Sequence, residues 1–320
     1  MGEERNLKRR RQSAPVGGRI GYFKGADDAP LRYGTWIPQG ENGRGTIVFL
    51  NGRSEFIEKH FETYADLSER GFHIATMDWR GQGLSGRMCK NPYKDHQLDF
   101  DLRRADLSAF LKSVVKAKMP GPYYVMGHSL GAHMMFHNLH DQPGFFEKAV
   151  ALAPMMGIAQ VPLPGWLMEV WENIMCGIGF CTAYLPGQGD YGEKRRSLER
   201  ADYLTSDIAR FRDEEAAIDL NPDLAMGGIT YGWLRAARRS NERLQSPGFP
   251  EAIKTPTLVL CAGADRVVDN EDVKAFTARL PHATLETIPG ARHELLKERG
   301  ELRSQVLGHI MRFLKSGPSQ

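Results

Sequence analysis

The chain has 320 residues, 41% of them hydrophobic and 25% charged, a composition typical of a soluble globular protein with enough apolar material for a core. Its formal net charge of +3 is too small to indicate a nucleic-acid partner, and we expect none. No window of about 20 apolar residues is present, and no apolar segment follows the basic start of the chain, so we expect neither a membrane span nor a secretory leader.

The first residues are strongly basic, with cationic side chains at Arg5, Lys8, Arg9, Arg10 and Arg11. We expect residues 1–16 to form a solvated, disordered tail. A sharper hypothesis is that residues 5–11 contact an anionic membrane, where each basic residue near the surface contributes about 1 kcal/mol.

The four cysteines, Cys89, Cys176, Cys181 and Cys261, contain no C-x-x-C pair. Their spacing suggests neither a disulfide framework nor a zinc site. We therefore expect reduced thiols, no bound metal and a cytoplasmic enzyme, located at the inner face of the membrane if the basic tail contacts lipid.

Strand-like and helix-like segments alternate along most of the chain. Short apolar runs typical of buried parallel strands occur at residues 31–37, 46–50, 73–78, 123–126, 149–152, 257–261 and 284–288. Amphipathic or helix-compatible patterns occupy residues 58–70, 99–118, 130–140, 271–280 and 301–315. The alternation predicts an α/β fold with a mainly parallel sheet and helices on both faces. The first strands have no helix between them, so we expect an antiparallel edge.

The alternation stops between residues 157 and 253, a segment too long to be a connecting loop. Its first third is apolar, its middle is charged, and it contains helical patterns of its own. We expect a helical cap over the carboxyl edge of the sheet, with residues 17–156 and 254–316 forming the core.

Residues 127–131 read Gly-His-Ser-Leu-Gly, the G-x-S-x-G pattern of a nucleophile elbow. An apolar strand precedes the motif and a helix-compatible segment follows it. Such a turn projects the serine hydroxyl above the sheet, and the flanking glycines leave room for the crowded backbone. Ser129 is therefore the candidate nucleophile.

A serine nucleophile needs a base, and the base needs an acid that fixes its tautomer. Asp265 and His293 each follow a predicted strand, in the order Ser, Asp, His that this arrangement requires. Asp265 could instead cap the helix near Asn270, and Asp269, four residues on, is the rival acid. We expect His128 to be a packing or supporting residue. His133, His137 and His140 share helical spacings, which favour a packed helix face over a metal site.

An oxyanion hole should come from main-chain N–H groups at two positions. One is Leu130, directly after the nucleophile. The other is Arg53, where Gly52 allows the backbone to approach a substrate. The glycine-rich loop at residues 78–86 lacks the ending of a P-loop, so we interpret it as a scaffold turn beside the site.

These motifs together resemble those of the α/β-hydrolase superfamily. The relevant stretches are N-G-R-S-E at 51–55, D-W-R-G-Q-G-L-S-G at 78–86, G-H-S-L-G at 127–131, G-A-D-R-V-V-D at 263–269 and R-H-E at 292–294. With the cap segment 221–237, they are most similar to the branch that contains lysophospholipase L2 and monoacylglycerol-lipase-like serine hydrolases. The resemblance covers roughly residues 17–315. It implies the nucleophile Ser129, the acid Asp265, the base His293 and the oxyanion donors Arg53 and Leu130. Many relatives have His-Gly where this chain has Asn51-Gly52, which leaves the side-chain organisation of that loop in question.

The resemblance implies a serine hydrolase that cleaves carboxylic esters of acyl lipids, lysophospholipids or monoacylglycerols, through an acyl-enzyme and without a cofactor. Trp166, Trp171, Phe180 and Trp233 are candidate walls for the acyl chain, although they could equally pack the cap against the core. A peptidase or amidase of the proline-iminopeptidase type is an alternative, with Glu172, Glu214 or Glu215 as the acid that binds a substrate amine. A non-catalytic ligand-binding protein is a second alternative.

Overall fold

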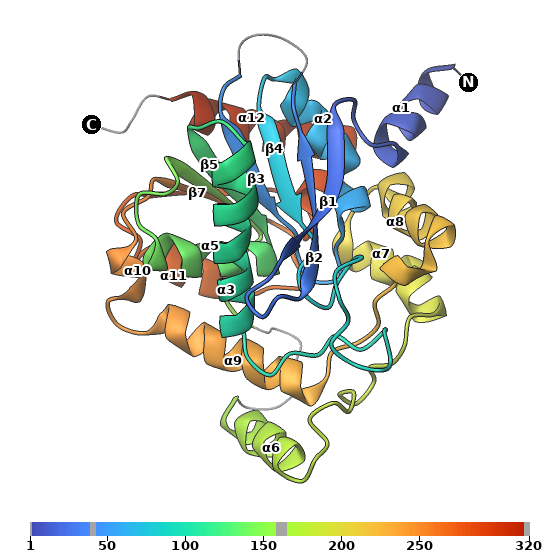
Figure 1. The fold of residues 1–320 in the computed structure, drawn as a ribbon, viewed down its shortest axis with the longest axis vertical. Helices are drawn as coiled ribbons and strands as arrows, with labels where there is room; N and C mark the ends of the chain where they lie inside the picture. Colours follow the sequence, from blue (N-terminus) through green and yellow to red (C-terminus); the bar gives the residue numbers. More distant parts are fainter. Residues whose placement is uncertain (1, 39–42, 158–164, 317–320) are drawn as a thin grey trace.

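The computed structural model describes residues 2–38, 43–157 and 165–316, and a single eight-stranded sheet organises them (Figure 1). The strand order is β1-β2-β4-β3-β5-β6-β7-β8. The strands are β1 (Gly18–Lys24), β2 (Pro30–Trp36), β3 (Thr46–Leu50), β4 (His73–Met77), β5 (Tyr123–His128), β6 (Lys148–Leu152), β7 (Thr257–Ala262) and β8 (Ala283–Ile288).

The sheet changes direction at β4. The β1–β2 and β2–β4 pairs are antiparallel, whereas every pair from β4 through β3, β5, β6 and β7 to β8 is parallel. The α/β fold with an antiparallel edge is therefore confirmed. The central strands β3, β6 and β7 are buried throughout, which explains why their sequences read as continuous apolar runs. The strand β1 was not predicted from the sequence, because its residues are mostly exposed and include two glycines.

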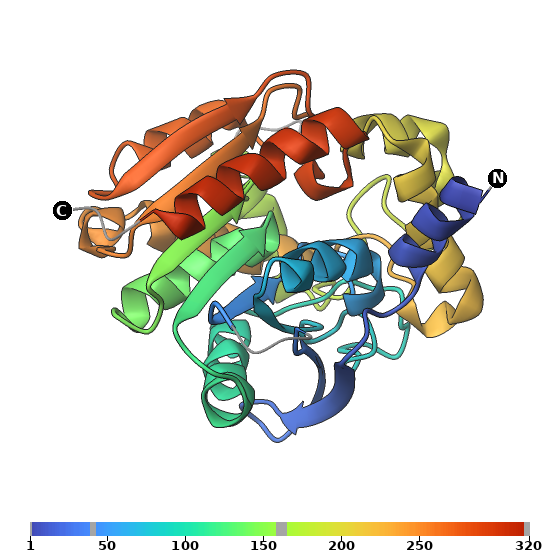
Figure 2. The same cartoon turned by 90° about the horizontal axis from the view of Figure 1, so that it is seen from above.

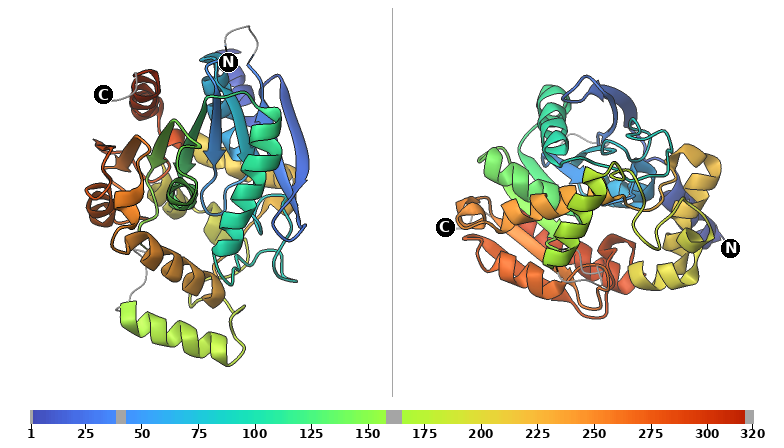
Figure 3. Two further views of the ribbon diagram at one scale, coloured as in Figure 1. Left: turned by 60° about the vertical axis from the view of Figure 1, so that its left-hand side comes forward. Right: turned by 90° about the horizontal axis from the view of Figure 1, so that it is seen from below.

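Helices cover both faces of the sheet (Figures 2 and 3). On one face, α2 and α12 are joined by an ion pair between Arg303 and Asp66. On the other face, α3, α5 and α11 lie together, and Phe136 packs edge-on against Phe276 with ring centroids 4.8 Å apart. The bounds are η1 (Ile57–His60), α2 (Phe61–Glu69), α3 (Asp101–Phe110), η2 (Leu111–Val115), α4 (Lys116–Lys118), α5 (Leu130–Asp141), α11 (Asn270–Thr277), η5 (Leu295–Lys297) and α12 (Gly300–Lys315).

The segment between β6 and β7 is helical where the structure describes it. It contains α6 (Gly165–Gly177), η3 (Glu193–Arg196), α7 (Leu198–Leu204), α8 (Ile208–Leu220), η4 (Pro222–Leu224), α9 (Tyr231–Gln245) and α10 (Phe249–Ala252). In Figure 1, α9 crosses beyond one end of the sheet and α6 lies farther out on α9. The Arg53 guanidinium, in the loop after β3, lies 5.9 Å from the ring of Trp233 on α9, so α9 sits at the carboxyl edge of the parallel strands.

The N-terminus differs from the disordered tail that its charge predicts. Gly2–Gln12 form the helix α1, which lies beside α2 and α8 (Figure 1). Arg10 pairs with Asp66 at 2.6 Å and with Glu69, and Arg11 Nε lies 2.7 Å from Asp213 Oδ2. The prediction was wrong because it considered these charges without partners, whereas carboxylates distant in sequence neutralise two of them.

The cysteines also differ from the expected set of reduced thiols. Cys176 and Cys181 form a disulfide across the turn that ends α6, while Cys89 and Cys261 are free. The turn brings the two Cα atoms to 4.0 Å, although the spacing matches no familiar cysteine motif. None of the helices in the described part of the chain is long and apolar enough to cross a membrane.

Candidate active site

Ser129 occupies the sharp turn between β5 and α5. Its φ of 51° and ψ of −113° lie in a region that non-glycine residues rarely adopt, as a nucleophile elbow requires. A Cβ at Gly127 would lie 2.5 Å from the backbone nitrogen of Ala132, and one at Gly131 would lie 2.0 Å from the carbonyl oxygen of Leu50. Both glycines of G-x-S-x-G are therefore required sterically, because only they let β5, α5 and β3 approach so closely.

Asp265 and His293 are in direct contact. His293 Nδ1 lies 2.9 Å from Asp265 Oδ2, and both side chains are buried. The other carboxylate oxygen of Asp265 accepts hydrogen bonds from the N–H groups of Val267 and Val268. Burial alone would raise the pKa of Asp265, but the hydrogen bond from His293 and these N–H groups hold it below its ordinary value. An ionised acid therefore orients the imidazole.

The rival acid has a structural role instead. Asp269 is the N-cap of α11, and its carboxylate accepts a hydrogen bond from the N–H of Glu271 at 2.8 Å. The structure thus brings Asp265, and not Asp269, to His293.

His128 connects the elbow to the loop that carries His293. Its Nε2 lies 3.1 Å from the main-chain oxygen of His293, and the two rings lie 4.9 Å apart. Its Nδ1 lies 3.0 Å from Glu55 Oε1. Both partners are acceptors, so both ring nitrogens must donate and the ring must be an imidazolium. Burial alone would lower the pKa of His128, but the Glu55 carboxylate raises it above its ordinary value.

Glu55 also holds the loop that follows β3. Its Oε2 accepts the N–H of Gly52 and faces His60 Nε2 at 3.1 Å. The N–H of Gly52 is therefore occupied, whereas the N–H of Arg53 has no acceptor among the described residues. The N–H of Leu130, at the first position of α5, has no intrahelical acceptor. The N–H groups of Arg53 and Leu130 are the two that the sequence predicts as donors of an oxyanion hole.

Side-chain hydrogen bonds support this loop even though the chain has Asn51-Gly52 where many relatives have His-Gly. Asn51 Nδ2 donates to the main-chain oxygen of Met77 at 2.9 Å. From the glycine-rich loop at residues 78–86, Trp79 Nε1 donates to the carbonyl of Asn51 and Gln82 Nε2 to that of Gly52. That loop is thus a scaffold for the candidate site, as its sequence indicated.

A buried lysine that the sequence did not single out connects α8 to the loops of the candidate site. Lys59 Nζ lies 2.8 Å from Glu214 Oε2 on α8, 2.7 Å from Glu294 Oε1 and 3.5 Å from Glu55 Oε1. Burial alone would lower the pKa of Lys59, but these carboxylates raise it. Lys59, in η1, follows Glu55 by four residues, a spacing that can pair opposite charges, and this was the one local signal available.

Of the four aromatic residues predicted to bind substrate, one is buried and three are exposed. Trp233 is 2% exposed and packs edge-on against Phe100, which matches the interpretation as core packing. Trp166, Trp171 and Phe180 are 69%, 45% and 53% exposed on and after α6, so in this conformation they do not form an enclosed wall.

Two histidines of α5 pack against α9, whereas His140 stacks on Phe249 of α10. His133 Nε2 and His137 Nε2 lie 2.7 and 2.8 Å from the hydroxyl of Ser240. Burial lowers the pKa of His133 to about 4, and its Nδ1 faces the carbonyl of Met155. Within residues 2–38, 43–157 and 165–316, no group of His, Cys, Asp or Glu side chains could hold a metal ion.

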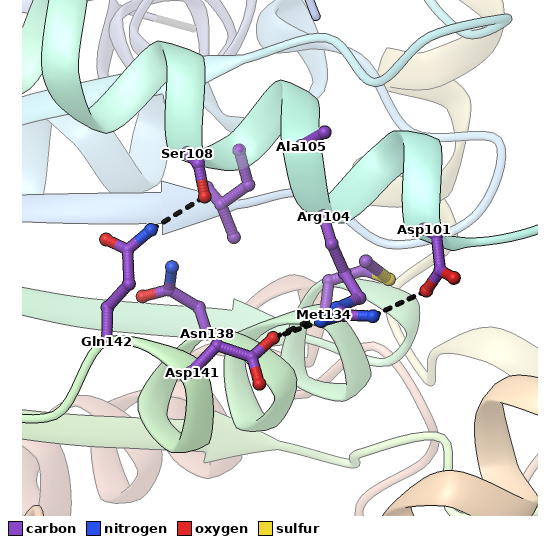
Figure 4. A pocket seen from close by; sticks show the side chains of 9 residues that line it. Asp101, Arg104, Ala105, Ser108, Met134, Asn138, Asp141 and Gln142 are labelled. Carbon is purple, nitrogen blue, oxygen red and sulfur yellow. Dashed lines mark hydrogen bonds and ion pairs between the residues drawn. The ribbon is translucent and has the colours of Figure 1, made fainter.

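A surface hollow between α3 and α5 is separate from the candidate site (Figure 4). Its charged groups neutralise one another, since Arg104 pairs with Asp101 and Asp141. It is bordered by later turns of α5, whereas Ser129 precedes the first turn. The lining residues are Asp101, Arg104, Ala105, Leu107, Ser108, Met134, Asn138, Asp141 and Gln142.

The fold and the arrangement of these side chains define an α/β-hydrolase of the serine-hydrolase class. Over residues 41–300 the chain matches the family described as "Serine aminopeptidase, S33", and it belongs to that family.

Individual relatives confirm the resemblance drawn from the motifs. Lysophospholipase L2 of Escherichia coli strain K12 is 31% identical over 303 residues, which cover 91% of this chain and 86% of that protein. Probable lysophospholipase L2 of Haemophilus influenzae is 29% identical over 294 residues, covering 92% and 91%. A solved structure of a soluble variant of monoglyceride lipase from Saccharomyces cerevisiae, in complex with a substrate analog, has a TM-score of 0.75 at 18% identity. It covers 96% of this chain and 97% of that chain, and shows the common fold.

Proposed function

We propose that the protein is a serine hydrolase that cleaves carboxylic esters of acyl lipids, lysophospholipids or monoacylglycerols, through an acyl-enzyme. The observation that carries this proposal is the buried Asp265–His293 pair beside the strained elbow of Ser129. The Ser129 hydroxyl attacks the ester carbonyl while His293 takes its proton. His293 then returns the proton to the leaving alcohol, and water releases the acid in a second cycle.

The N–H groups of Arg53 and Leu130 bind the oxyanion that forms on the carbonyl oxygen. Each such donor contributes about 2.7–4 kcal/mol to the stability of the transition state. These side chains and N–H groups supply nucleophile, base, acid and oxyanion donors, so the reaction as proposed uses no cofactor.

We further propose that residues 157–253 act as a cap over a core of residues 17–156 and 254–316. Trp166, Trp171 and Phe180, exposed on and after α6, contact the acyl chain where the lipid enters. The names of the lysophospholipase and monoglyceride lipase relatives agree with an acyl ester as substrate.

The peptidase alternative lacks an available carboxylate at two of its three candidates. A substrate amine would need an acidic side chain without another partner, but Glu214 is held by Lys59 and Arg200, and Glu172 by Arg238. The third candidate, Glu215, forms no such ion pair among the described residues, and burial raises its pKa above the ordinary value. The intact Asp265–His293 pair argues against a non-catalytic ligand-binding protein.

We propose in addition that the protein acts in the cytoplasm and contacts anionic membranes through α1. Arg10 and Arg11 are engaged by carboxylates, but Arg5, Lys8 and Arg9 remain exposed. A thiol titration of the protein, with free thiols trapped in intact cells before lysis, tests this location. Disulfides are rare in that compartment, so a persistent Cys176–Cys181 bond would speak against it.

Replacement of the nucleophile tests the proposed function. Ser129→Ala should reduce the kcat for p-nitrophenyl acyl esters by about 10³-fold or more while the circular dichroism spectrum stays the same. Ser113→Ala, an exposed serine of η2, is the matched control. Hydrolysis at the wild-type rate by folded Ser129→Ala protein would refute the assignment.

A further inference from the structure

Several arginines where the cap meets the core contact carbonyl oxygens or sulfur in place of carboxylates. Arg195 donates to the carbonyl of Gly227, Arg87 to those of Gly81 and Asp223, and Arg235 contacts the sulfur of Cys181. Among the described residues, none of these three arginines forms an ion pair within 4.0 Å. Buried or half-buried guanidinium groups usually have carboxylate partners, so this region holds an excess of positive charge.

Arg53 and Arg195 both contact residues at one short backbone bridge. The bridge pairs Asp95 with Ile229, with hydrogen bonds from Asp95 N–H to Gly228 and from Thr230 N–H to Asp95. Arg53 Nη1 lies 3.3 Å from Asp95 Oδ2, while Arg195 binds the carbonyl of Gly227 at the same bridge. Burial, together with the positive charges of Arg53 and Arg200, lowers the pKa of Arg195 to about 9.

The carboxylates near these arginines are already shared. Asp95 faces both Arg53 and Arg103, the latter at 3.6 Å. Glu214 faces both Lys59 and Arg200. An anionic ligand between Arg53 and Arg195 would therefore offset a repulsion that Asp95 and Glu214 compensate only in part.

We propose that Arg53 and Arg195 form a subsite for the phosphate of an acylated glycerophosphate lipid, which selects lysophospholipids over monoacylglycerols. The inference rests on the proposed function, because the N–H of Arg53 must face the ester carbonyl. The side chain of the same residue then extends toward the phosphate, which the glycerol carbons of a lysophospholipid separate from that carbonyl. Guanidinium groups suit this role because their planar array of donors matches phosphate oxygens.

The test compares two substrates that share an acyl chain. Initial rates are measured for palmitoyl lysophosphatidylglycerol and for monopalmitoylglycerol in micelles of a neutral detergent. Arg195→Met should lower the ratio of their kcat/KM values, lysophospholipid over monoacylglycerol, about tenfold or more, since a charged hydrogen bond is lost. Arg195→Lys keeps the charge and should restore part of the ratio. Arg53→Gln, which retains the main-chain N–H, should lower the ratio as well.

The adjacent Arg196 provides the matched control. It is exposed and pairs with Asp219, so Arg196→Met removes one positive charge from the same turn without touching the bridge. The ratio of the two kcat/KM values in Arg196→Met should stay within about twofold of the wild-type ratio. An equal fall in Arg196→Met and Arg195→Met would overturn the subsite, because surface charge alone would then explain the preference.

Inhibition by inorganic phosphate distinguishes a subsite for a lipid headgroup from a site that binds free phosphate. If phosphate inhibits p-nitrophenyl ester hydrolysis in wild type but not in Arg195→Met, while the lipid ratio is unchanged, the site takes free phosphate and the headgroup assignment is wrong. If wild-type protein hydrolyses both lipids and Arg195→Met leaves the ratio and the inhibition unchanged, the subsite fails and the proposed function stands. If wild-type protein hydrolyses neither lipid, the proposed function itself fails.

Discussion

At the residue scale, one buried imidazolium fixes the relation between three loops of the candidate site. His128 donates to the main-chain carbonyl of His293 and to Glu55, and Glu55 in turn accepts the N–H of Gly52. The turn at Ser129, the loop that carries His293 and the loop after β3 are therefore held together by side chains that need not touch a substrate. We regard His128 and Glu55 as positioning residues for this reason.

Removal of the imidazolium should impair the positioning of His293 more than it weakens substrate binding. In His128→Asn, we expect kcat to fall about tenfold or more with a smaller change in KM, because His293 loses the contact that holds its backbone. The free energy of unfolding should fall by about 1.5–3 kcal/mol at mildly acidic pH. Urea unfolding and steady-state kinetics measure the two effects.

The pH dependence distinguishes an imidazolium from a neutral ring. The pKa of His128 is raised on folding, so its stabilising effect is complete below the ordinary pKa of 6.5 and is lost as pH rises through the higher folded value. The stability difference between wild type and His128→Asn should therefore shrink toward alkaline pH. His282→Asn, at an exposed histidine before β8, is the control. A difference that grows with pH would contradict a charged His128.

At the element scale, local sequence patterns predict the parallel strands well and the periphery poorly. Strands such as β3 and β7 are buried on both faces, so their sequence is nearly all apolar and marks their position. The edge strand β1 has mostly exposed residues, so it lacks the apolar pattern of a strand. It is defined by its antiparallel pairing with β2. Ser129, Asp265 and His293 each follow a strand of one parallel sheet, and this is why their order along the chain predicts a candidate site at its carboxyl edge.

The failures have two causes, namely a local turn that the sequence patterns do not mark and partners that lie on distant elements. The Cys176–Cys181 bond depends on the turn after α6, and the docking of α1 depends on Asp66 and Asp213, which are distant in sequence from Arg10 and Arg11. Glu55 ends the motif at residues 51–55, and Lys59 lies four residues beyond it. The carboxylates that pair with Lys59, Glu214 and Glu294, lie far away in the sequence, so local spacing could not predict these ion pairs.

The docked state of α1 sharpens the test of membrane contact. A triple change of Arg5, Lys8 and Arg9 to Gln removes exposed charge and leaves the ion pairs of Arg10 and Arg11 intact. Binding to vesicles of phosphatidylglycerol should weaken about tenfold or more, since each basic residue contributes about 1 kcal/mol. Sedimentation with vesicles measures the effect.

The matched control carries the same loss of charge elsewhere. Lys90, Lys112 and Lys116 are exposed, and their change to Gln should leave vesicle binding close to wild type. Equal weakening in both triple variants would show that net charge, rather than α1, drives the association.

At the scale of the whole molecule, charged residues from distant parts of the chain gather between the core and the helices α7 and α8. Lys59, Glu214 and Glu294 satisfy one another there. Lys297, in η5, lies near them but its Nζ has no hydrogen-bond partner in the described part of the chain. Lys297 is 2% exposed, and its burial lowers its pKa to about 8. The charged form of this lysine is therefore a destabilising element of the fold.

Lys297→Met should raise the free energy of unfolding at neutral pH by about 1–3 kcal/mol, because it removes a buried charge and keeps a similar volume. In wild type the unfolded chain binds the extra proton between pH 8 and 10.5, so wild-type stability rises with pH in that window. The advantage of the variant should accordingly shrink as pH approaches 10.5. Urea unfolding of both proteins below and above pH 8 measures this, with exposed Lys112→Met as the control for loss of one positive charge. A variant that is less stable than wild type at neutral pH would show that Lys297 is a needed counter-charge for the neighbouring Asp213 and Glu62.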